Sequence, residues 1–199
     1  MTGRLIAFEG GEASGKSTQA AILARRLGAV LTREPGGTAV GERIRSLLLD
    51  PGVVELDARA EALLMAADRA QHVAEVVRPA LESGRHVVSD RFSHSSLAYQ
   101  GCGRGLRVDE LRQLSEWACA GLWPDVVVLI DVPERTALER GRGSDRFGRE
   151  DPGFHRRVAD GYRRLAAQEP DRWRVVDGTG KVGEVAERVW AAVQASVSA

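Results

Sequence analysis

Short runs of almost unbroken apolar residues recur along the chain, separated by longer stretches in which apolar residues return every three or four positions. Strands that are buried on both faces are rich in Val, Ile and Leu without polar alternation, and they form parallel sheets covered by helices. The sequence therefore predicts five such strands, at residues 4–10, 28–34, 85–91, 124–132 and 172–178.

The stretches between these strands have the apolar spacing of amphipathic helices. The predicted helices cover residues 16–27, 38–49, 57–83, 108–120, 133–141, 153–168 and 181–195. The longest is followed by Gly84, a residue type that commonly ends helices. Strands and helices alternating in this way predict a doubly wound α/β fold, in which ligands bind at the carboxyl ends of the strands.

A length of 199 residues fits one domain, and no repeat or low-complexity linker divides residues 1–199. The 28 basic residues are balanced by 28 acidic ones, so the overall charge favours neither nucleic acid nor an anionic membrane as a partner. No apolar stretch approaches the ~20 residues that span a bilayer. Cys102 and Cys119 lack the spacing of metal ligands, and two reduced cysteines indicate a cytoplasmic protein.

The segment after the first strand matches GxxxxGK[ST], the phosphate-binding loop (P-loop) of P-loop NTPase-like folds. The nucleotide-binding residues predicted from it are Gly10, Gly11, Glu12, Ala13, Ser14, Gly15, Lys16, Ser17 and Thr18. Glycines let backbone N–H groups surround phosphate oxygens, and the following helix adds its positive end. Lys16, one of only two lysines in the chain, is expected to reach the β- and γ-phosphates of ATP, and Ser17 to ligate Mg²⁺.

A P-loop leaves three reaction classes: a GTPase-like switch, an ATP-driven machine or binding module, and a small-molecule kinase. The chain contains no asparagine and so lacks the Asn-Lys-x-Asp guanine-binding motif of a GTPase. "VVVLID", ending in Asp131, could supply the acidic residue of an ATPase. A P-loop ATPase or binding module without a nucleotide acceptor therefore remains the alternative to a kinase.

Two further segments favour a kinase of small phosphorylated substrates. Asp90 and Arg91 stand at the carboxyl end of a predicted strand, where an aspartate can hold Mg²⁺ and an arginine can bind a phosphate through two hydrogen bonds. "ERGRGSDRFGRED" is rich in arginine and glycine and follows a predicted helix. It predicts a lid, at about residues 140–150, that closes over polyphosphate and supplies positive charge.

Taken together, "FEGGEASGKST", "TREPGGT", "LLMAADRAQHV" and "VVSDRFSHSSLAYQG" resemble the bacterial thymidylate kinase family, over about residues 4–178. The resemblance implies phosphorylation of dTMP to dTDP with ATP and Mg²⁺. It also implies a five-stranded parallel sheet flanked by helices and a homodimer.

By the same resemblance, five residues acquire roles in binding dTMP. Glu12 is expected to accept a hydrogen bond from the 3′-hydroxyl, and Arg91 to bind the phosphate. Arg69 is expected to reach the thymine ring, with Ser96 as a further polar contact. Tyr99 is expected to fill the space at the 2′ position, which favours deoxyribose.

The chain departs from the family pattern in two places. Some members carry a P-loop arginine where this chain has Ala13 or Ser14, so the charge on the transferring group is expected from lid arginines, Arg142 and Arg146. Members often have phenylalanine stacked on thymine where this chain has Met65, whose thioether can also pack against an aromatic ring.

Overall fold

The computed structural model contains one five-stranded sheet in which neighbouring strands run parallel. The structure describes residues 3–53, 55–141 and 143–197. The strands are β1 (Leu5–Glu9), β2 (Val30–Arg33), β3 (Val87–Asp90), β4 (Val126–Asp131) and β5 (Trp173–Asp177). They lie in the order β2-β3-β1-β4-β5, so the strand that leads into the P-loop is central. The predicted α/β fold with five parallel strands is confirmed.

The register brings the carboxyl ends of the central strands together. Phe8 lies opposite Asp90 on one side and Val128 on the other. The whole of β1 is buried, as expected for a strand covered on both faces. Glu9 and Asp90 therefore lie at the same edge of the sheet, where this class of fold binds its ligands.

The helices agree with the predicted segments except at their ends, and except for residues 93–103, where the structure has two helices and the predicted segments include none. They are α1 (Lys16–Leu27), α2 (Ala39–Leu49), α3 (Ala58–His72), η1 (Val73–Val77), α4 (Arg78–Glu82), α5 (Ser93–Ser96), η2 (Leu97–Gly103), α6 (Val108–Ala118), α7 (Glu134–Arg140), α8 (Pro152–Gln168) and α9 (Val182–Val197). The long helix predicted at 57–83 is the consecutive run α3, η1 and α4, with a π-helical turn at its centre.

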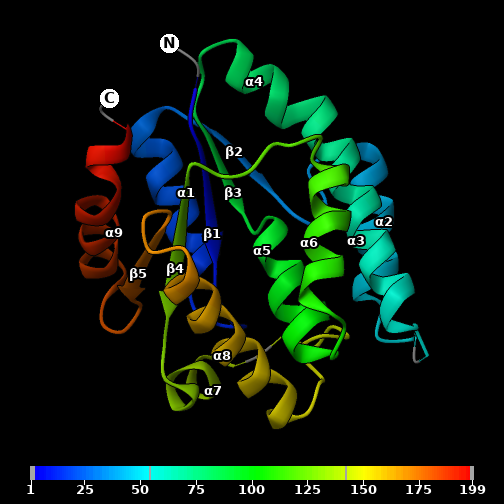
Figure 1. The fold of residues 1–199 in the computed structure, drawn as a ribbon. Helices are drawn as coiled ribbons and strands as arrows, with labels where there is room; N and C mark the ends of the chain where they lie inside the picture. Colours follow the sequence, from blue (N-terminus) through cyan, green and yellow to red (C-terminus); the bar gives the residue numbers. More distant parts are fainter. Residues whose placement is uncertain (1–2, 54, 142, 198–199) are drawn as a thin grey trace.

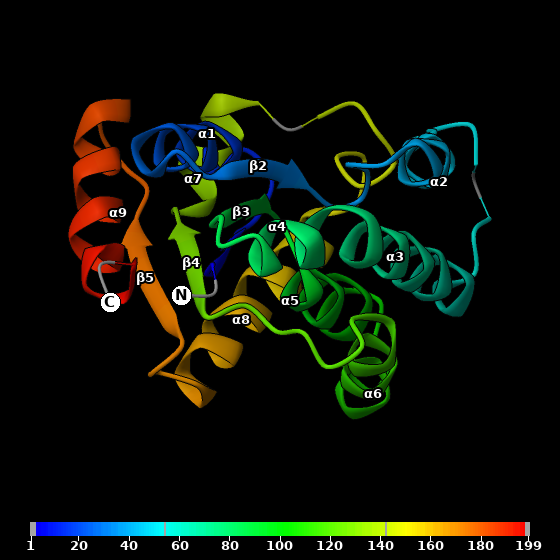
Figure 2. The same ribbon diagram turned by 90° about the horizontal axis from the view of Figure 1, so that it is seen from above.

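Helices cover both faces of the sheet (Figures 1 and 2). On one face, α1 and α9 pack against the sheet through a cluster that includes Phe8, Leu23 and Val189. On the other face, η1 and α4 cover β1 and β3, while α8 and η2 cover β4 and β5. Within the described residues, no helix is both long and apolar enough to cross a membrane.

The described part of the lid, residues 140–141 and 143–150, lies between α7 and α8 in the chain and reaches the end of α2 (Figure 2). Its Arg146 N–H donates to the carbonyl of Leu49 at 3.2 Å, which fixes the tip of the lid against α2. The lid, α2 and α3 thus enclose the space beyond the carboxyl edge of the sheet.

His94 of α5 is fully buried between the rings of Trp123 and Trp173, with centroids 5.3 and 4.9 Å away. Burial, reinforced by the charges of Arg172 and Arg112, lowers the pKa of His94 to about 3. In the unfolded chain the imidazole regains its ordinary pKa of about 6.5. Below that pH the unfolded state therefore takes up a proton that the folded state does not. The free energy of unfolding decreases as the pH is lowered.

The wild-type protein should lose about 2.5 kcal/mol of unfolding free energy through His94 alone between pH 7.5 and 4.5. A His94→Phe variant should lack this contribution. Urea unfolding of both proteins at pH 7.5, 5.5 and 4.5 measures the difference between them at each pH. A difference that does not change with pH would contradict this assignment.

Candidate active site

Two positions of the P-loop have a backbone conformation that favours glycine. Gly10 and Gly15 have φ of 149° and 92°, in the region that favours glycine. A Cβ on Gly10 would also lie 2.7 Å from the carbonyl oxygen of Ile130. The loop runs directly into α1, whose first residue is Lys16, so the N–H groups of the first turn face the loop.

Lys16 is 7% exposed, and its Nζ donates to the carbonyl of Gly11 at 3.2 Å. Burial, together with the charge of Arg91, lowers the pKa of Lys16 to about 8, although Glu12 and Asp90 favour the charged form. Its charged amine lies within the curl of the loop, as the predicted phosphate contact requires.

Ser17 and Asp90, the two predicted magnesium ligands, line the same pocket. Oδ1 of Asp90 is buried and accepts no hydrogen bond from any residue that the structure describes. A buried carboxylate oxygen without a donor is suited to a hard cation, since Mg²⁺ prefers oxygen ligands. These residues fit a magnesium ion.

Arg91 follows directly after β3, and its φ of 72° is unusual for a residue with a side chain. Its Nη1 donates to the oxygens of Gly10, Ser95 and Tyr162 at 3.1–3.2 Å. Its Nη2 donates to Oε1 of Glu12 and to the hydroxyl of Tyr99, both at 3.0 Å. The guanidinium is therefore fixed at the mouth of the P-loop.

Glu12 and Tyr99 share this cluster, since the Tyr99 hydroxyl also donates to Oε1 of Glu12 at 3.2 Å. Burial alone would raise the pKa of Glu12, but the charges of Arg91 and Lys16 outweigh it and hold the pKa below its ordinary value. Glu12 is thus an ionised acceptor beside two cations.

Arg69 is 2% exposed and lines the same pocket. Its Nε donates to Glu34 Oε2 at 2.8 Å, and its Nη2 to Ser96 Oγ at 3.1 Å. Glu34 also contacts Nδ1 of His72 at 2.9 Å. Ser96 is buried and supports Arg69 from behind.

The main pocket has a volume of about 310 Å³ and joins these groups in one space. Met65 contributes to its wall, one helical turn before Arg69, and also packs against the hydrophobic core. Asp145 and Phe147 of the lid close part of the pocket. Its lining includes Glu12, Lys16, Ser17, Glu34, Met65, Arg69, Asp90, Arg91 and Tyr99.

The lid arginines lie in different places. Arg140 donates to the carbonyls of Ser14 and Gly178, at 2.9 and 2.8 Å, and so links the P-loop to the turn after β5. Arg146 donates to the carbonyl of Leu48 and pairs with buried Glu61 at 2.6 Å. Arg142 lies outside the described residues. The catalytic roles of Arg142 and Arg146 remain predictions, and Arg146 would have to leave Glu61 to reach a phosphate.

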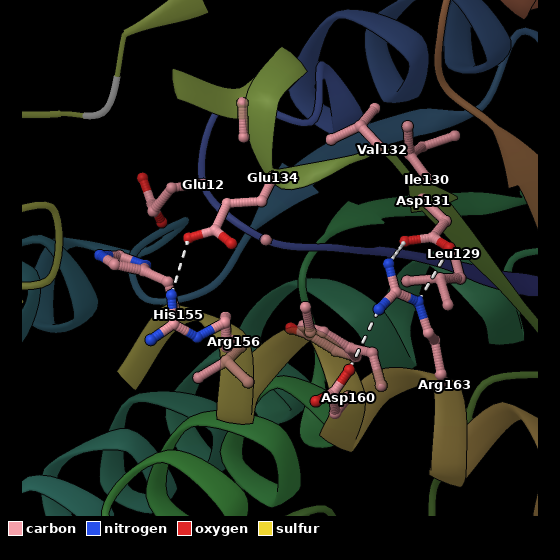
Figure 3. A pocket seen from close by; sticks show the side chains of 15 residues that line it. Glu12, Leu129, Ile130, Asp131, Val132, Glu134, His155, Arg156, Asp160 and Arg163 are labelled. Atoms are coloured by element: carbon pink, nitrogen blue, oxygen red, sulfur yellow. Dashed lines mark hydrogen bonds and ion pairs between the residues drawn. The ribbon is translucent and has the colours of Figure 1, made fainter. Parts of the chain in front are cut away.

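A second pocket of about 220 Å³ lies between β4, α7 and α8 (Figure 3). Glu12 lines both pockets. Asp131 accepts from Nε and Nη2 of Arg163, at 3.1 and 2.9 Å, and Arg163 also pairs with Asp160. Both Asp131 oxygens are therefore occupied, which argues against the alternative reading of Asp131 as an ATPase acid.

Sequence reasoning missed three buried residues that hold the site together. Glu34 supports Arg69, and Glu9 and Tyr162 lie behind Arg91. An acidic residue directly after four apolar strand residues was a signal for Glu9. Glu34 lies within the quoted "TREPGGT" motif, whereas nothing in the local pattern distinguishes Tyr162.

Known proteins resemble this chain over nearly its whole length. The model of the family described as thymidylate kinase matches residues 8–189. The thymidylate kinase of Pelotomaculum thermopropionicum is 50% identical over 188 residues, or 90% of this chain and 87% of the relative. That of Rhizorhabdus wittichii is also 50% identical, over 95% of this chain and 96% of the relative.

The fold agrees with these sequence matches. The crystal structure of thymidylate kinase from Ehrlichia chaffeensis superposes with a TM-score of 0.82 at 32% identity, and the match covers 98% of this chain and 100% of that one. With a family model that matches most of its length and relatives half identical to it, this chain belongs to the thymidylate kinase family.

Proposed function

We propose that this protein transfers the γ-phosphoryl group of ATP to dTMP, forming ADP and dTDP for dTTP synthesis. The observation that carries the proposal is that Lys16 of the P-loop, Arg91 and buried Arg69 all line one pocket. Arg91 contacts the P-loop at Gly10 and Glu12, whereas Arg69 contacts Glu34 and Ser96. A nucleoside monophosphate bound with its base at Arg69 would have its phosphate at Arg91, facing the P-loop.

The P-loop and Arg91 have distinct tasks. The P-loop, Gly10 to Thr18, binds the ATP phosphates, with Lys16 on the β- and γ-phosphates. Arg91 holds the acceptor phosphate, whose oxygen is already a competent nucleophile, so no general base is required. Phosphoryl transfer depends on position and on neutralisation of charge.

The nucleoside of dTMP is held by the remaining residues. Glu12 accepts from the 3′-hydroxyl, and Tyr99 fills the 2′ position. Met65 packs on thymine, and Arg69 donates to the base with Ser96 behind it. The buried Glu34–Arg69 pair supports this assignment because it holds the guanidinium in one orientation.

Ser17 and Asp90 would hold Mg²⁺, which neutralises phosphate charge when it is bound. The lid adds charge through Arg142 and Arg146 and excludes water from the site. Arg140 contributes by tying the start of the lid to the P-loop carbonyls.

We further propose a cytoplasmic homodimer that binds neither membrane nor nucleic acid. The free thiols of Cys102 and Cys119 support a reducing compartment. Leu63 on α3 and Trp117 on α6, two helices that pack together, are exposed apolar side chains that a second copy could cover. Light scattering across a dilution series tests the dimer.

A coupled ADP-release assay with dTMP, dUMP, dGMP, dCMP, UMP and AMP tests the reaction directly. Release should require an acceptor and be fastest with dTMP. Lys16→Ala should lower this rate by about 100-fold or more while the thermal unfolding curve is retained, because the lysine charge acts on the transferring group. ADP release that is independent of any acceptor would instead support the P-loop ATPase alternative.

Asp90→Asn and Asp131→Asn form a matched pair at the carboxyl ends of two strands. Asp90→Asn should lower kcat by about 100-fold and raise the Mg²⁺ concentration needed for half-maximal rate, because one charged ligand is lost. Asp131→Asn removes only a partly exposed ion pair, worth about 1 kcal/mol or less, and should leave kcat unchanged. A magnesium titration of both variants measures this, and equal losses would refute the assignment of Asp90.

Met65→Phe should tighten dTMP binding, because an offset aromatic stack contributes about 0.5–1.5 kcal/mol beyond burial. The KM for dTMP should fall roughly two- to tenfold if KM follows binding. Met65→Ala should raise that KM with little change in kcat. If both substitutions shift only the melting temperature, Met65 acts as a core residue and makes no contact with thymine.

A further inference from the structure

Glu9 is a fully buried acid at the carboxyl end of the central strand, and the proposed phosphoryl transfer does not use it directly. It is not among the residues that line the pocket of Glu12 and Lys16, and the hydroxyls of Ser95 and Tyr162 connect it to Arg91. A buried carboxylate is costly unless it is hydrogen-bonded, so its partners indicate why the chain retains it.

The carboxylate of Glu9 accepts four hydrogen bonds from its surroundings. Oε1 accepts from the backbone N–H groups of Phe92 and Ser95 at 3.0 and 3.2 Å. Oε2 accepts from the hydroxyls of Ser95 and Tyr162 at 2.5 and 2.9 Å. Burial raises the pKa of Glu9, and these donors together with the charge of Arg91 oppose that rise. Four donors around two oxygens match an ionised carboxylate.

The two hydroxyls also contact Arg91. Its Nη1 donates to Ser95 Oγ at 3.2 Å and to the Tyr162 hydroxyl at 3.1 Å. A hydroxyl has one proton to give and two lone pairs to accept with. When its proton points to Glu9, its lone pairs are free to accept from Arg91. By accepting the hydroxyl protons, the carboxylate thus makes Ser95 and Tyr162 acceptors for the guanidinium of Arg91.

We propose that Glu9 is a positioning residue for the acceptor phosphate: by accepting from Tyr162 and Ser95, it turns both hydroxyl oxygens toward Arg91 and fixes the guanidinium that binds the phosphate. The inference rests on the proposed role of Arg91. It assigns to Glu9 no contact with substrate.

A glutamine at position 9 has almost the same volume but the opposite polarity at one terminal atom. Its carbonyl oxygen can take the place of Oε1 and accept from the backbone N–H groups of Phe92 and Ser95. Its NH₂ group then faces the two hydroxyls and donates to them. The two hydroxyls lie 2.9 Å apart, so one of them can give its proton to the other. The remaining proton is displaced toward Nη1 of Arg91, which is itself a donor, and the guanidinium loses one of its acceptors.

Calorimetric titration of wild type and Glu9→Gln with dTMP and with thymidine tests this directly. Thymidine lacks the phosphate and serves as the internal control. Glu9→Gln should weaken dTMP binding by about 10- to 100-fold, the range for lost hydrogen bonds to a charged group. Thymidine binding should stay within about twofold of wild type.

Tyr162→Phe and Ser95→Ala provide variants with smaller changes in case Glu9→Gln does not fold. Each removes one hydroxyl and should weaken dTMP binding by about three- to tenfold, again without effect on thymidine. Added to Glu9→Gln, Tyr162→Phe should cost little more, because the contact is already lost. Such non-additivity is expected for residues that act through one chain of contacts.

Unchanged dTMP affinity in Glu9→Gln, or in Tyr162→Phe where the former does not fold, would overturn the inference. An equal loss for dTMP and thymidine would also overturn it, since that pattern reflects general damage to the pocket. Wild-type protein that binds dTMP no more tightly than thymidine would instead refute the role of Arg91 in the proposed function.

Discussion

The constraint on which this site depends is the concentration of positive charge in a chain whose formal net charge is zero. Lys16, Arg69 and Arg91 line one pocket, and burying a charge without a partner is prohibitively costly. The chain meets this cost with carboxylates placed individually: Glu12 pairs with Arg91, and Glu34 with Arg69. Each pair leaves the cation charged and also determines where it points, so charge compensation and substrate orientation are the same set of contacts.

Helix α3 collects several of these contacts on one face. Glu61, Met65 and Arg69 are spaced four residues apart, which places them in one row along the helix. Glu61, the first residue of the row, pairs with lid Arg146. Met65 and Arg69, the next two, both line the pocket. Glu61 also pairs with Arg104, which follows η2. The position of α3 therefore sets the lid anchor and the place of Arg69 in the pocket together.

The sequence was informative wherever function depends on a local pattern. Strand β1, the glycines of the P-loop and Lys16 follow one another along the chain, so their arrangement could be predicted from spacing alone. Asp90 and Arg91 could be placed beside them because parallel strands end at one edge of a sheet. The partner of Arg146 could not be predicted, since Glu61 is 85 positions away and carries no local signature of its contact. Tyr162 is a similar case: helical spacing predicts that it is buried, but not that its hydroxyl reaches Glu9.

The use of hydroxyls between Glu9 and Arg91 has an electrostatic reason. Glu12 already contacts Nη2 of Arg91 directly. A second carboxylate in direct contact with Nη1 would place two negative charges beside one positive charge. Because the Coulomb energy is largest between close charges, such a carboxylate would weaken the attraction of Arg91 for an incoming phosphate. Neutral hydroxyls from Ser95 and Tyr162 satisfy the same donor without adding charge. The carboxylate one layer behind then fixes their direction, so the arginine stays both ordered and positive where the phosphate is to bind.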